Sequence, residues 1–152
     1  MQALETLINQ LESRIPQFET INPTISKSNI GWHIDHALMV LSGIIDTTSK
    51  SDPDKYKWKF NVKRFVVMFK NKIPRGKAKA PKSVQPIGDY TIESLTKKVA
   101  IAKSKLEQLK QLPKNKYFEH PGLGPMKLKQ TIKFLEIHTR HHYEIIADIE
   151  KE

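Results

Sequence analysis

The sequence predicts an all-α protein: a bundle of four main helices, with an extra short helix and a long basic loop between the second and third of them. Apolar residues recur at three- and four-residue steps in four long segments, and proline or glycine lies between those segments. The length of 152 residues fits one domain, residues 1–152, and allows a core without disulfide support.

The first two helices are predicted from apolar spacing and from the residues that bound them. Residues 4–15 form the first, ended by Pro16, and its apolar face consists of Leu4, Leu7, Ile8, Leu11 and Ile15. Ser28 is a candidate N-cap for the second, which runs to about residue 48. Apolar residues cover a wide stripe of this second helix, so we expect it to be deeply buried.

The middle of the chain predicts the short helix and the loop. Residues 58–71 mix phenylalanine and valine with lysine, and they predict a shorter helix. Residues 72–89 have no helical period and are interrupted by Pro74, Gly76, Pro81, Pro86 and Gly88. A loop of that length inside a domain is often functional.

The last two helices complete the predicted bundle. One begins at Thr91 and keeps its apolar rhythm until Pro113. A loop containing Pro121, Gly122, Gly124 and Pro125 follows. The final helix runs from about residue 126 to residue 149, and a bundle of this kind has room for a cofactor in its core.

Composition excludes several classes of site. The chain has no cysteine, so disulfides, zinc–thiolate sites and cysteine nucleophiles are absent. A transition-metal site must therefore use histidine and carboxylate, which suit zinc, nickel, iron or manganese. Residues 1–15 alternate polar with apolar residues, unlike a signal peptide, and no uninterrupted apolar run exceeds that of residues 65–69. We therefore expect a cytoplasmic protein without a membrane partner.

Two histidines of the last predicted helix lie on its apolar face. His138 and His142 are four residues apart, so the rings stack one above the other in line with Leu135 and Ile146. Two rings so placed can bind one ion. The alternative is a pair of core histidines satisfied by hydrogen bonds. Because each unpaired buried imidazole costs about 1–3 kcal/mol, and one metal ion satisfies both, we favour the metal.

The second predicted helix offers a third ligand. His33 and His36 both lie near its apolar side, and helical geometry alone does not choose between them. Trp32, one turn before His36, is placed to form an apolar wall beside the same space.

Several motifs, taken together and in order, carry a family resemblance. The stretch Ser28-Asn29-Ile30-Gly31-Trp32-His33-Ile34-Asp35-His36 resembles the opening of the second helix of DinB-like proteins. The stretches His120-Pro121-Gly122-Leu123-Gly124 and His138-Thr139-Arg140-His141-His142 are similar to the last loop and last helix of that family. The resemblance covers about residues 28–149.

The resemblance implies a three-histidine site for one divalent metal ion. By that correspondence His36, His138 and His142 are the ligands, and His33 and His141 lie behind them or at the surface. We expect zinc or nickel first, with iron or manganese as alternatives. Three neutral imidazoles leave the ion an open position, as in catalytic sites. No catalytic residue is assigned, because nothing ranks His33, Asp35, Glu136 and His141 as a general base.

What is known of DinB-like proteins implies the class of reaction. The family includes metal-dependent thiol transferases and isomerases, so we expect a metal-dependent enzyme with a small-molecule substrate, such as a low-molecular-weight thiol. Hydrolytic chemistry is a related option. A homodimer is also open, because bundles of this size often pair through a helix face.

The net charge of +10 is confined to one segment. Residues 50–82 contain 12 Lys/Arg and 2 acids, and the rest of the chain carries 14 charges of each sign. The anion-binding candidates are Lys70, Lys72, Arg75, Lys77, Lys79 and Lys82. The other interpretation of the segment is a solvated loop. The alternative function is a non-enzymatic protein whose basic loop contacts nucleic acid or another anionic partner, although no nucleic-acid-binding motif supports it.

Overall fold

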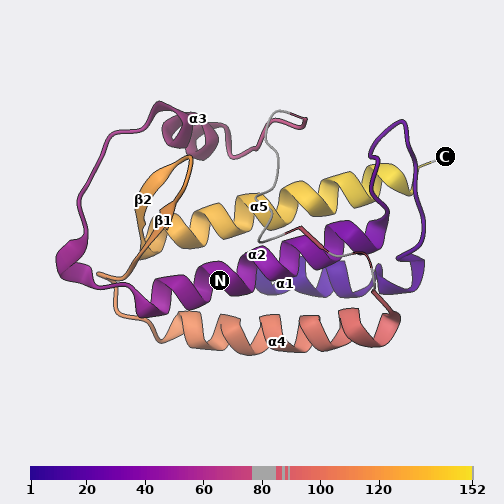
Figure 1. Ribbon diagram of the computed structural model, residues 1–152, viewed down its shortest axis with the longest axis horizontal. Coiled ribbons are helices and arrows are strands. Elements are labelled where there is room, and N and C mark those ends of the chain that lie inside the picture. Colours follow the sequence, from indigo (N-terminus) through magenta and orange to yellow (C-terminus); the bar gives the residue numbers. More distant parts are fainter. Residues whose placement is uncertain (77–84, 87, 89, 152) are drawn as a thin grey trace.

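Four helices enclose the apolar core, and a short fifth helix lies outside them (Figure 1). The computed structural model describes residues 1–76, 85–86, 88 and 90–151. The bundle helices are α1 (Gln2–Glu12), α2 (Ile30–Lys50), α4 (Ile92–Lys110) and α5 (Leu128–Ile149). Both α1 and α2 pack against α4 and α5. The predicted all-α fold is confirmed.

The linker between α1 and α2 corrects two predicted boundaries. The first helix ends at Glu12, and Pro16 belongs to a separate 3-10 turn, η1 (Ile15–Gln17). The N-cap of α2 is Asn29, whose side chain accepts a hydrogen bond of 2.9 Å from the backbone N–H of Trp32. Ser28 was therefore the wrong one of two adjacent capping residues, and the helix starts one residue later than predicted.

A close backbone contact fixes the entry of α2. The N–H of Gly31 donates to the carbonyl of Phe18 at 2.7 Å. A Cβ at Gly31 would lie 2.9 Å from the ring of Tyr90. Only glycine fits between the linker and that ring, so the start of α2, and with it His33 and His36, has a fixed position.

A small hairpin precedes α5, where the sequence predicted only a loop. Strands β1 (Tyr117–His120) and β2 (Gly124–Lys127) pair antiparallel, with Tyr117 opposite Lys127. Gly124 has φ +72°, which favours glycine at this position. Because β2 leads directly into Leu128, the hairpin sets the start of α5.

Helix α3 (Val62–Lys70) is shorter than predicted and lies over the hairpin (Figure 1). Residues 58–61 are not helical, because Asn61 caps the helix by accepting from the N–H of Arg64 at 2.9 Å. The buried guanidinium of Arg64 donates to the carbonyls of Leu123 (3.1 Å), Pro125 (2.7 Å) and Lys59. Arg64 therefore holds α3 against the hairpin.

The other features of the fold are local. Helix α4 begins with a reciprocal capping box between Thr91 and Ser94. A second 3-10 turn, η2 (Pro53–Lys55), follows α2. Within the described part of the chain, no helix is both long enough and apolar enough to cross a membrane.

We predict that Arg64→Ala lowers the free energy of unfolding by about 2–4 kcal/mol, because three carbonyls lose a charged donor and two of those hydrogen bonds are buried. Urea denaturation measures the change. Lys63→Ala is the matched control. Lys63 is the exposed neighbour of Arg64, so its replacement should change the free energy of unfolding by less than about 0.5 kcal/mol. Equal effects of the two variants would show that the guanidinium does not hold α3 in place.

Candidate metal centre

Three histidines from two helices meet in the bundle. His36 lies in the second turn of α2, and His138 and His142 lie one turn apart on α5, which packs against α2. One ring nitrogen from each lies within 4.8 Å of the others. The ring centroids are 4.7 Å apart for His36–His142, 4.8 Å for His138–His142 and 5.3 Å for His36–His138. The structure thus brings together the three residues that the resemblance implied.

The spacing suits a divalent ion after small side-chain rotations. Three nitrogens at about 2.1 Å from one ion are about 3.4 Å apart in a tetrahedral set. His36 and His142 are buried, whereas His138 is only partly so. Metal ligands must be neutral imidazoles, and this set consists of imidazoles alone, so the donor chemistry fits zinc or nickel.

The surroundings keep the rings neutral. Burial lowers the pKa of His138 to about 3, with a further contribution from His36. Burial also lowers the pKa of His142 well below its usual value, and the neighbouring histidines add to that effect. A neutral ring keeps the lone pair that binds a metal, so the site is ready for a cation at neutral pH.

His33 lies behind His142. Its Nδ1 lies 3.0 Å from Nδ1 of His142, and its Nε2 lies 2.9 Å from Oγ of Ser26. Since Nδ1 of His142 is engaged in this hydrogen bond, its Nε2 is the atom left for an ion. His142 then donates through Nδ1 to His33, and His33 donates through Nε2 to Ser26. Burial lowers the pKa of His33 to about 4, which agrees with a neutral His33 ring between Ser26 and His142.

Ser26 was not predicted from the sequence. It lies in the linker before α2, and its hydroxyl also accepts from the N–H of Ser28 at 3.1 Å. A polar linker of this composition gives no periodic signal, so only the folded structure shows that this serine reaches a histidine.

Trp32 forms the apolar wall that the sequence predicted. Its ring stacks on His36 with centroids 5.0 Å apart and an interplanar angle of 12°. It also meets His33 edge-on at 5.1 Å. The indole restricts the rotation of His36 and covers one side of the site.

Two further histidines lie near the three. His141 meets His142 edge-on at 5.1 Å, and its pKa is lowered, chiefly by burial and then by the charge of Arg75. Its Nδ1 is buried without a hydrogen-bond partner among the described residues.

His120 packs on Phe134, which in turn contacts His138. The motif that contains His120 therefore approaches the site through an aromatic ring.

The two carboxylates considered as general bases are paired elsewhere. Asp35 is buried and accepts from Lys98 of α4 at 2.5 Å. Glu136 lies 3.7 Å from the N-terminal ammonium and 3.9 Å from Lys133. The other two candidates, His33 and His141, both contact the ring of His142.

Half of the anion-binding candidates fall within the described residues. Lys70 and Lys72 are exposed, and Arg75 forms an ion pair of 2.8 Å with Asp148 of α5. The charge of Arg75 helps to lower the pKa of both His33 and His141, so this part of the basic segment lies near the histidines. Lys77, Lys79 and Lys82 lie outside the described residues.

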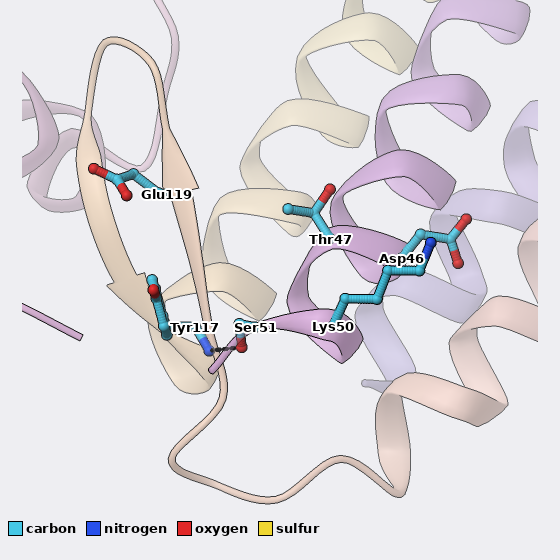
Figure 2. Close-up of a pocket in the computed structure, with 6 residues that line it drawn as sticks. All are labelled: Asp46, Thr47, Lys50, Ser51, Tyr117 and Glu119. Atoms are coloured by element: carbon cyan, nitrogen blue, oxygen red, sulfur yellow. Dashed lines mark hydrogen bonds between the residues drawn. The ribbon is translucent and has the colours of Figure 1, made fainter. Parts of the chain in front are cut away.

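A separate hollow lies at the end of α2, away from the histidines (Figure 2). It has a volume of about 390 Å³, and its lining consists of Asp46, Thr47, Lys50, Ser51, Tyr117 and Glu119. Asp46 pairs with Lys105, and Ser51 Oγ accepts from the N–H of Tyr117 at 3.1 Å (Figure 2). Much of its polar lining is thus already satisfied within the protein.

We predict that the metal-free protein loses stability as the pH falls from about 6.5 toward about 3–4. The unfolded histidines take up protons near pH 6.5, whereas folded His33 and His138 do so only near pH 4 and 3, so the unfolded state binds more protons in that window. Each such histidine adds up to about 1.4 kcal/mol per pH unit to the slope. Urea unfolding in the presence of a chelator measures it. His138→Gln should flatten the slope, and an unchanged slope would contradict the assignment.

Comparison with known proteins places the chain in a family. No curated protein and no solved structure matches it. A family model described as the DinB superfamily matches residues 2–146, which includes the whole of α2 and all three histidines. That match covers more of the chain than the motifs that suggested it. The chain belongs to the DinB superfamily.

Proposed function

We propose that the protein is a metal-dependent enzyme in which His36, His138 and His142 hold one divalent ion, zinc or nickel in the first instance. The observation that carries the proposal is the meeting of three imidazoles from two helices, with ligand atoms within 4.8 Å of one another. Membership of the DinB superfamily supports it.

A divalent ion bound by three neutral ligands supplies a Lewis acid that lowers the pKa of water or of a thiol at its open position. The chain itself supplies the surroundings. His33 and Ser26 fix the orientation of His142, and Trp32 covers one side of His36. Because His138 is only partly buried, its side of the site is where a substrate can enter.

The substrate class follows from the charges near the site. Arg75 and Lys72 are close enough for their charge to lower the pKa of His141. We infer a substrate or cosubstrate that carries an anionic group, and a low-molecular-weight thiol with a carboxylate fits both this charge and thiol-transferase chemistry. Of the residues considered as general bases, His141 is the available proton acceptor, since Asp35 is paired with Lys98 and Glu136 with the N-terminal ammonium.

We predict that the purified protein binds about one equivalent of divalent metal per chain and that His142→Ala abolishes this binding, because two remaining imidazoles hold an ion poorly. Elemental analysis after addition of zinc or nickel and gel filtration measures the stoichiometry. His120→Ala is the matched control: this histidine lies beyond Phe134 and should leave the stoichiometry unchanged.

The proposal would be contradicted by protein that was never exposed to a chelator, contains no metal, and also fails to bind added zinc or nickel. The alternative function, a non-enzymatic protein that contacts an anionic partner, would then be favoured, with the histidines in a structural role.

We predict that His36→Ala removes the metal, whereas His33→Ala keeps the stoichiometry and weakens affinity by about 10–100-fold, because His142 loses the partner that orients it. Competition with a chromophoric chelator measures affinity. His33→Gln, which can still accept a hydrogen bond, should recover part of the loss. Loss of metal in His33→Ala with retention in His36→Ala would show that the ligand on α2 is misassigned by one turn.

A further inference from the structure

One face of α3 and the segment before it expose an unusual amount of apolar surface. The exposed residues, called here the α3 surface, are Trp58, Phe60, Val62, Phe65, Val66 and Phe69. Phe69 is 79% exposed and Trp58 is 68% exposed. A solvated loop does not require such residues, and a contiguous apolar surface on a folded protein usually marks a binding site.

The apolar face has the spacing of an amphipathic helix. Val62, Phe65, Val66 and Phe69 follow one another at steps of three, one and three residues, so they share one side of α3. Phe65 and Phe69 stack with centroids 5.9 Å apart. Trp58 and Phe60 lie 6.5 Å apart just before the helix and widen the surface beyond a single helical stripe.

The opposite face of α3 determines that this surface points outward. Arg64 and Val67 are buried, and Arg64 and Asn61 hydrogen-bond to the carbonyls of the hairpin. The apolar residues therefore face away from the bundle because the helix is anchored on its other side. Figure 1 shows α3 over the hairpin, outside the layer of the four main helices.

Lysines surround the apolar residues. Lys55, Lys57, Lys59, Lys63, Lys70 and Lys72 are all exposed, and no acidic residue occurs between positions 55 and 72. Within the described part of the chain, only Lys55 of these six has an ion-pair partner, the exposed Asp52 at 3.6 Å. The surface combines an apolar centre with an uncompensated positive rim.

We propose that the α3 surface binds the face of an anionic lipid bilayer. Apolar side chains of an interfacial helix enter the boundary between headgroups and acyl chains, and lysines beside them reach anionic headgroups. Tryptophan at the border of the apolar region is typical of that depth. The sequence predicted no membrane partner because no segment can span a bilayer, but peripheral binding needs no span.

The charge pattern argues against other occupants. A symmetric pairing of two copies through this face would place the lysine rim of one chain against that of the other, which is unfavourable. Single-stranded nucleic acid uses lysines and ring faces, but the two valines of the α3 surface offer a base neither stacking nor hydrogen bonds. Aliphatic and aromatic residues together, inside a basic rim, match lipid better.

Vesicle binding tests the proposal without reference to the metal site. Wild-type protein should co-sediment with vesicles of equal parts phosphatidylglycerol and phosphatidylcholine, and not with phosphatidylcholine alone. The double variant Phe65→Asp with Phe69→Asp should bind about tenfold or more weakly, because it loses the apolar anchor and gains two negative charges. The matched control is Ile92→Asp with Ile101→Asp, which makes the same charge change at exposed apolar residues of α4 and should bind as wild type does.

Two further variants keep the test independent of folding. Replacement of Lys57, Lys59 and Lys63 with Gln leaves the apolar face intact and should weaken binding to anionic vesicles by about tenfold. Tryptophan fluorescence should shift to shorter wavelength on binding, and this shift should vanish in Trp58→Phe although Trp32 remains.

The following outcomes would overturn the proposal. They are equal binding to neutral and anionic vesicles, equal binding by the Phe65/Phe69 and Ile92/Ile101 variants, or no binding to either vesicle. Binding to a labelled oligonucleotide with no vesicle binding would assign the surface to nucleic acid instead. A wild-type dimer that the Phe65/Phe69 variant converts to monomer, with no vesicle binding, would assign it to a second copy of the chain.

Discussion

The packing of α2 against α5 is the contact on which the candidate site depends, because it brings polar rings from two helices into one buried space. Imidazoles buried in this way must find partners or lower the stability of the fold. His33 finds His142 and Ser26, which leaves one nitrogen of His142 directed away from that chain. The same contact that forms the core thus brings together ring nitrogens that could hold a cation.

The hydrogen bonds behind His142 also determine which of its ring nitrogens faces the candidate metal site. These hydrogen bonds run from Ser26 in the linker, through His33 on α2, to His142 on α5. Each ring has one nitrogen facing the preceding residue in this series. Gly31 holds the beginning of α2 close to Phe18 and Tyr90, so the histidine that orients His142 is itself placed by the linker. Backbone contacts near residue 31 therefore bear on a site more than one helical turn away.

The sequence predicted the helices well because their apolar spacing is regular, and it predicted the pairing of His138 with His142 because a separation of four residues fixes a common helix face. It missed the hairpin, since strands of four residues that contain Gly124 and Pro125 show no alternation. The choice of His36 over His33 needed the family resemblance, because it depends on how α2 is rotated toward α5. The contact between His33 and His142 joins residues 109 positions apart, and no local pattern encodes it.

Arg64 has a mechanical consequence. Its guanidinium spans the carbonyls of Leu123 and Pro125, and β2 continues without a break into α5. Helix α3, the hairpin and the first turn of α5 are therefore joined by hydrogen bonds and by continuous backbone, and a displacement of α3 would reach the start of the helix that carries His138, about three turns further along. The α3 surface and the candidate metal centre, although separate in chemistry, are thus joined through the hairpin and α5.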